Sequence, residues 1–138
     1  MKFNVKNIDC TLRDGGYYND WDFSFEFVKK YLLALSVAQI NYVELGFRLL
    51  NNKGFKGAYA FCKDDFLNKL DIPTGINIAI MINADDLISD NSLNWEALEI
   101  LVPLKSGESK VNLLRIASTF DDFEIIAPAF KILKQKGY

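Results

Sequence analysis

The stretch DCTLRDGG, residues 9–16, brings a cation, a carboxylate and two glycines to the end of a strand-like run. The run itself, residues 7–12, predicts a β-strand, so Arg13 and Asp14 fall just past its carboxyl end. In a parallel α/β protein these strand ends form the active-site face, where Arg13 would offer a cation and Asp14 a hard oxygen ligand. Gly15 and Gly16 are expected to let the backbone turn sharply and to leave room for a substrate.

Outward from this stretch, three more strand-like runs follow at starts roughly 35 residues apart, and each is followed by a helix-like stretch. These runs are residues 42–46, 76–82 and 113–117. Because they are mostly apolar, they predict a parallel sheet covered on its faces, built from repeated βα units. Glu44 in the second run and Arg115 in the fourth lie near the same end as Arg13, and we expect both to face one cavity.

Two helices are well marked by apolar stripes with acidic residues in the first turn. The first stripe contains Phe23, Phe27, Val28, Tyr31, Leu32 and Leu35, and the last contains Phe123, Ile126, Ala127, Phe130 and Leu133. Pro128 conflicts with the last helix, because proline removes one main-chain hydrogen bond. The long connection of residues 48–71, with a short helix predicted over residues 63–69, is expected to be an active-site loop.

Alternating βα units suit either a closed (β/α)8 barrel or an open doubly wound sheet. The 138 residues are the size of one domain, and a complete barrel takes about 250 residues. The barrel interpretation therefore makes residues 1–138 a single partial domain, the N-terminal half of a TIM barrel with about four βα units. The final residues, Lys136-Gly137-Tyr138, are expected to be a helix cap leading toward a further strand.

Composition narrows the function classes. The net charge of −2 is spread along the chain without a basic stripe, so nucleic acid is not an expected partner. The apolar runs are too short to span a membrane, and no secretory leader is recognisable, so we expect a cytoplasmic protein with no membrane partner. Cys10 and Cys62 are then expected to be thiols, and without histidine or a CxxC pair a structural zinc site is not expected.

Residues 9–15, DCTLRDG, together with YVELG at residues 42–46, resemble the DRE-TIM metallolyase superfamily. That family includes 4-hydroxy-2-oxovalerate aldolase, HMG-CoA lyase and the isopropylmalate and homocitrate synthases. The resemblance covers the topology of the whole chain, but its specific residues lie within the first 48 positions. It implies a divalent-metal-dependent aldolase or lyase that cleaves a carbon-carbon bond in a 2-oxo acid or acyl thioester, most like 4-hydroxy-2-oxovalerate aldolase.

The resemblance also implies roles for individual residues. Asp14 matches the aspartate that binds Mn²⁺ or Mg²⁺, Arg13 the arginine that steadies the developing enolate oxygen, and Glu44 the glutamate that orients this arginine. A Lewis-acid metal and a neighbouring guanidinium suit enolate formation. By its own chemistry, Arg115 suits a substrate carboxylate, because its donors form a fork.

The sequence departs from the family pattern in its proton-transfer and metal-binding residues. The family's remaining metal ligands are a His-x-His pair, and this chain contains no histidine. The 138-residue chain is therefore expected to be inactive alone. Tyr17 and Tyr18 follow the glycines near the position where valerate-type aldolases carry a histidine, and either tyrosine can be interpreted as a proton donor or as packing.

Two other functions remain open from the sequence. One is a non-enzymatic half-barrel that forms a homo-oligomer, or binds another chain, through its open sheet edges. The other is a flavodoxin-like domain in which Asp14-Gly15-Gly16 holds a phosphate ester at a helix N-terminus. The carboxylate of Asp14 argues against this second alternative, because it repels phosphate.

Overall fold

The central element of the computed structural model, which describes residues 5–51 and 53–138, is a sheet of four parallel strands. Its strands are β1 (Ile8–Asp9), β2 (Tyr42–Phe47), β3 (Asn77–Asn83) and β6 (Val111–Ala117), which follow one another across the sheet in chain order. Sequential order is that of a (β/α)8 barrel, whereas a doubly wound sheet reverses its order at a switch point. The predicted α/β half-barrel is confirmed, and the flavodoxin-like alternative is wrong.

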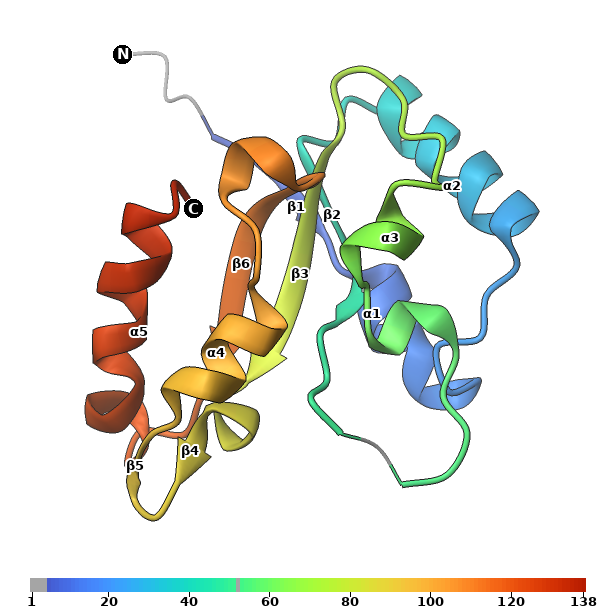
Figure 1. Cartoon of the computed structure of the whole chain (residues 1–138). Coiled ribbons are helices and arrows are strands. Elements are labelled where there is room, and N and C mark those ends of the chain that lie inside the picture. Colours follow the sequence, from blue (N-terminus) through green and yellow to red (C-terminus); the bar gives the residue numbers. More distant parts are fainter. Residues whose placement is uncertain (1–4, 52) are drawn as a thin grey trace.

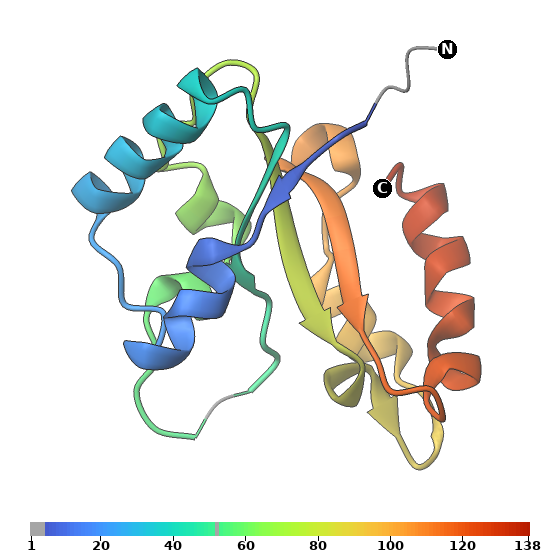
Figure 2. The same cartoon turned by 180° about the vertical axis from the view of Figure 1, so that it is seen from behind.

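Helices follow the strands and lie beside the sheet, with α2 and α3 next to β1 and β2, and α4 and α5 next to β3 and β6 (Figures 1 and 2). A short antiparallel hairpin, β4–β5, lies past the carboxyl end of β3. The helical and hairpin segments are α1 (Thr11–Gly15), η1 (Gly16–Tyr18), α2 (Phe25–Val37), η2 (Ala58–Ala60), α3 (Asp64–Leu67), η3 (Ala84–Leu87), β4 (Ile88–Ser89), β5 (Ser92–Leu93), α4 (Trp95–Leu101), η4 (Ser106–Glu108) and α5 (Phe123–Gln135).

The first strand is shorter than predicted, because the chain becomes helical at Thr11. The Asp9 carboxylate accepts hydrogen bonds from the Thr11 backbone N–H at 3.1 Å and from its hydroxyl at 3.0 Å, which turns the chain out of the extended conformation. Asp9 also accepts a hydrogen bond from the Tyr31 hydroxyl of α2. Arg13 and Asp14 therefore lie past the carboxyl end of β1, as predicted, but on a helical turn.

Helix α2 begins at Phe25, where the Ser24 hydroxyl caps it by accepting a hydrogen bond from the Phe27 N–H at 3.2 Å. Helix α5 continues through Pro128 and ends before Gly137, whose φ of 90° suits a glycine cap. The predicted stripes are too wide, because Phe27, Phe123 and Phe130 stay about half exposed. The buried positions are Val28 and Leu32 in α2, and Ile126, Ala129 and Leu133 in α5.

The core occupies the helix-facing side of the sheet. Val43 and Leu45 of β2 pack in one cluster with α2 and Tyr59, while Ile82 of β3 packs with α4 and α5. Because side chains alternate across a strand, Glu44 points to the face opposite Val43 and Leu45. That face carries the candidate site. No helix in the described ranges is long and apolar enough to cross a bilayer.

One core group lacks a partner. Tyr59 is 1% exposed, and no group in residues 5–51 and 53–138 lies within hydrogen-bonding distance of its hydroxyl. The ring packs edge-on against Phe66 with centroids 4.8 Å apart, and burial raises the pKa of the phenol.

We predict that Tyr59→Phe does not lower the free energy of unfolding and raises it by up to about 1 kcal/mol. The substitution removes a desolvated hydroxyl that makes no hydrogen bond. The matched control is Tyr31→Phe, which removes a hydroxyl that does bond Asp9, and it should lose about 1 kcal/mol. Urea denaturation measures both changes. A loss in Tyr59→Phe as large as in the control would show that the Tyr59 hydroxyl has a partner.

Candidate functional site

Glu44 is the centre of the site. Its carboxylate is fully buried, and two arginines from different segments share it. Arg13 of α1 donates from Nε to Oε2 at 2.8 Å, and Arg115 of β6 donates from Nη1 to both oxygens at 3.0 Å. A buried carboxylate is tolerated only when it is paired and hydrogen-bonded, and these two cations provide both. The structure therefore brings together three predicted site residues from three elements.

Arg13 is held on two sides. Its Nη1 pairs with the Asp14 carboxylate next to it, while its Nε is on Glu44. Burial disfavours the charge of Arg13, but the hydrogen bond and charge of Glu44, with the charge of Asp14, outweigh burial and raise the pKa of the guanidinium. Arg13 is therefore a permanent, oriented cation.

Arg115 is the more open of the two arginines, with 40% of its side chain exposed against 15% for Arg13. All its hydrogen bonds to described residues leave from Nη1, including one to the Cys10 sulfur at 3.5 Å. Its Nε and Nη2 groups make no hydrogen bond to residues 5–51 or 53–138, so they are free to donate hydrogen bonds to an anionic ligand. A free guanidinium edge suits a carboxylate.

Arg13, Glu44 and Arg115 form a cluster, the arginine cluster. Cys10 was not predicted to be part of it, but the Cys10 thiol lies next to Arg115 and Glu44. Burial raises the pKa of the Cys10 thiol, and the charge and hydrogen bonding of Glu44 raise it further against the opposing charges of Arg115 and Arg13. Cys10 is thus a protonated neighbour of the ion pairs. Cys62 is fully buried elsewhere, where burial raises the pKa of its thiol to about 12.

The two glycines differ from expectation. Both have helical φ angles, −65° and −60°, so neither makes the sharp turn predicted for them. Gly16 is needed for space, because a Cβ there would lie 2.0 Å from the Trp21 ring. A Cβ at Gly15 would meet no atom within 4 Å, so the space beside this glycine is open.

Trp21 is a positioning residue that was not predicted from the sequence. Its indole N–H donates to the Arg13 carbonyl oxygen at 2.9 Å, and its ring packs edge-on against Phe47 at 5.3 Å between centroids. Lys56 lies over the same ring and pairs with Asp20. The connection after β2, which was predicted to be an active-site loop, therefore supports the helical turn that carries Arg13. Its contact with the site is structural.

Of the described residues at this site, Asp14 is the one that could coordinate a metal ion. Asp14 is exposed and oxygen-bearing, but its carboxylate pairs with Arg13, and both Glu44 oxygens are occupied by arginines. No group of three or more His, Cys, Asp or Glu side chains in the described ranges is arranged to hold a metal. Asp14 fits a metal as a single ligand, but the described residues do not form a complete metal site.

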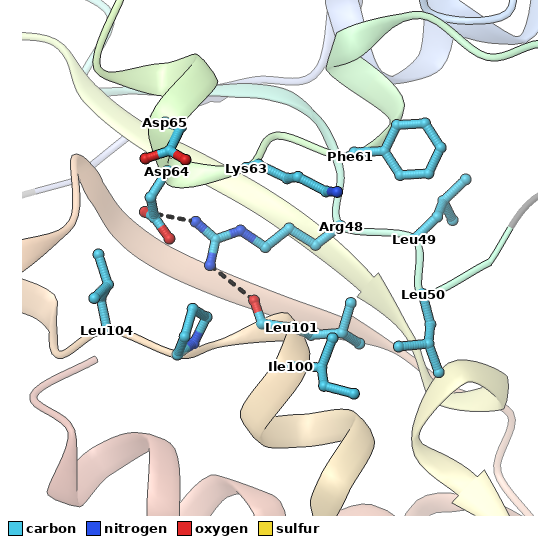
Figure 3. Close-up of a pocket in the computed structure, with 11 residues that line it drawn as sticks. Arg48, Leu49, Leu50, Phe61, Lys63, Asp64, Asp65, Ile100, Leu101 and Leu104 are labelled. Carbon is cyan, nitrogen blue, oxygen red and sulfur yellow. Dashed lines mark hydrogen bonds and ion pairs between the residues drawn. The ribbon is translucent and has the colours of Figure 1, made fainter.

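A separate hollow of about 430 Å³ lies on the helix-facing side, between the chain after β2 and the end of α4 (Figure 3). The buried Arg48 donates to the carbonyl oxygens of Cys62 and Leu101 and to the Asp64 carboxylate. These bonds join β2, α3 and α4, so the role of Arg48 is structural. The hollow shares no residue with the arginine cluster.

The chain was compared with known proteins and with solved structures. The chain is similar to the crystal structure of the N-terminal domain of a candidate aldolase from Bacteroides vulgatus, with a TM-score of 0.79 and 32% sequence identity. The alignment covers 97% of this chain but 42% of that chain, so this chain spans less than half of its length. No family model and no curated protein matches the sequence. The fold is thus similar to that of the N-terminal domain of this candidate aldolase.

We predict that Glu44→Gln destabilises the protein by about 3 kcal/mol, because it leaves two arginines facing a buried neutral amide. Urea denaturation measures the change. Glu96→Gln, in the first turn of α4 and outside the ion pairs of the described residues, is the control and should change stability by less than about 1 kcal/mol. Equal effects of the two substitutions would show that the buried ion pairs do not support the fold.

Proposed function

We propose that this chain forms the N-terminal half of the active site of a metal-dependent aldolase or lyase of the DRE-TIM type. Its substrate would be a 2-oxo acid or acyl thioester, and the reaction would cleave a carbon-carbon bond, as in 4-hydroxy-2-oxovalerate aldolase. The single observation that carries the proposal is the buried Glu44 carboxylate shared by Arg13 and Arg115 on the open face of a half-barrel. The aldolase-like fold supports it.

The two arginines suit two parts of a 2-oxo acid. The free Nε and Nη2 edge of Arg115 would bind the substrate carboxylate in a forked pair. Arg13, oriented through Glu44, would stabilise the negative charge that develops on the neighbouring oxygen when the bond breaks and an enolate forms. Gly15 would leave room for the substrate beside the two arginines. Gly16 would contribute indirectly, because its missing side chain leaves space for the Trp21 ring.

A divalent metal, Mn²⁺ or Mg²⁺, is part of the proposal through Asp14 alone. When bound, such an ion would act as a Lewis acid toward the substrate oxygens. Because the described residues supply only this ligand, the other ligands would have to come from outside them. The 138-residue chain alone is therefore proposed to bind substrate without catalysing its cleavage.

The alternative of a non-enzymatic half-barrel that associates through its edges also has an observation in its favour. The outer sides of β1 and β6 pair with no strand among the described residues, and Phe123 and Phe130 on α5 beside β6 remain exposed. Open edges and exposed aromatic rings favour association with another copy or chain. The two functions are compatible, because a partner would also close the site.

We predict that the chain binds oxalate, a planar dianion with the oxygen arrangement of a 2-oxo acid enolate, and that Arg115→Lys weakens this binding about tenfold. Lysine keeps the charge but loses the fork of donors. Isothermal titration calorimetry measures both affinities, and Lys131→Gln on the exposed side of α5 is a control for net charge. Unchanged oxalate affinity in Arg115→Lys would remove Arg115 from the site.

A second prediction concerns Asp14. Asp14→Asn should weaken Mn²⁺ binding measured in the presence of oxalate by at least about fivefold, because a neutral amide replaces a charged oxygen ligand. Without metal, the same variant should bind oxalate more tightly, since Arg13 loses a competing carboxylate. Electron paramagnetic resonance of free Mn²⁺ measures the metal affinity, and isothermal titration calorimetry measures the oxalate affinity without metal. Equal Mn²⁺ affinity in both proteins would contradict the metal role of Asp14.

A further inference from the structure

Tyr17 lies on the same side of the helical turn as Arg13. Segments α1 and η1 are continuous, with helical φ angles at Gly15 and Gly16, so Arg13 and Tyr17 stand four residues apart along one helical path. Side chains at this spacing are neighbours on a helix surface. Tyr18 is instead one position further round and is 96% exposed.

The Tyr17 ring is fixed by the residues that fix Arg13. It packs edge-on against Trp21, with centroids 4.8 Å apart, and against Phe47 at 6.2 Å. The Arg13 guanidinium lies 6.0 Å from the centre of the same Phe47 ring, and Trp21 holds the Arg13 carbonyl. Tyr17 and Arg13 therefore flank one buried aromatic ring, and their relative position is set by shared contacts.

The Tyr17 hydroxyl is available to a ligand. Tyr17 is 65% exposed although its ring is packed, and no residue in the described ranges exchanges a hydrogen bond with the hydroxyl. An amphipathic ring buried at one edge with a free polar tip is suited to contact with a bound molecule.

Other proton-bearing or proton-accepting groups around the arginines are already engaged. The chain has no histidine, both Glu44 oxygens are bonded to arginines, and Asp14 is paired with Arg13. The Cys10 thiol lies against Glu44 and Arg115. Among the described residues of the cluster, the Tyr17 hydroxyl is thus a neutral donor that remains free for a substrate oxygen.

We propose that Tyr17 is a substrate-contacting residue whose hydroxyl donates a hydrogen bond to the anionic oxygen held by Arg13. The substrate class is the 2-oxo acid of the proposed function, on which this inference rests. Tyr18 has no part in the contact.

Oxalate binding to the full 138-residue chain tests the assignment. Tyr17→Phe keeps the packed ring and removes only the hydroxyl, so it should weaken oxalate binding about tenfold, as expected for a lost hydrogen bond to a charged group, with an unchanged melting temperature. Tyr18→Phe is the matched control and should bind within about twofold of wild type. Oxalate should also perturb the tyrosine ultraviolet absorption of the wild type, and this difference spectrum should vanish in Tyr17→Phe alone.

The outcomes separate this inference from the proposed function. Wild type that does not bind oxalate would overturn both. Wild type that binds oxalate through Arg115, with Tyr17→Phe unaffected and its difference spectrum retained, would overturn the role of Tyr17 alone. Weakened binding in Tyr17→Leu but not in Tyr17→Phe would also overturn it, because the ring rather than the hydroxyl would then matter.

Discussion

The site depends on the burial of one carboxylate. Glu44 has no exposed surface and lies on a strand whose neighbouring side chains are core residues, so its charge must be compensated inside the protein. Arg13 and Arg115 do this from segments that lie about 30 and 70 positions away in the sequence. Their ion pairs join the start, the middle and the end of the sheet. The same contacts leave one edge of Arg115 free, and this edge is the feature that a substrate anion would recognise.

A polar centre of this kind requires that the two faces of the sheet differ. On β2 the residues on either side of Glu44 pack against helix α2, whereas Glu44 itself faces away from the helices. Strand alternation makes this division, and the sequential strand order brings Arg115 to the same face. In the helix-facing core, burial raises the pKa of the Tyr59 hydroxyl and of the Cys62 thiol.

The helical turn after β1 is supported from a different part of the chain. Gly16 admits the Trp21 ring, Trp21 bonds the Arg13 carbonyl, and Lys56 from the connection after β2 lies over that ring. This packing also positions Tyr17 beside Arg13. The long connection therefore contributes to the site by holding its geometry, and its residues need not touch a ligand to affect binding.

Much was determined by the sequence alone. The four βα units and the α/β class follow from local pattern, because apolar periodicity acts over a few residues. The grouping of Arg13, Glu44 and Arg115 near one sheet end was predicted by adding the general rule that the carboxyl ends of parallel strands share one face. Only the tertiary structure decided the sequential strand order, the early helical turn at Thr11, the exposure of Phe27, Phe123 and Phe130, and the role of Trp21. These features depend on contacts between distant segments, and a local pattern carries no information about which segments meet.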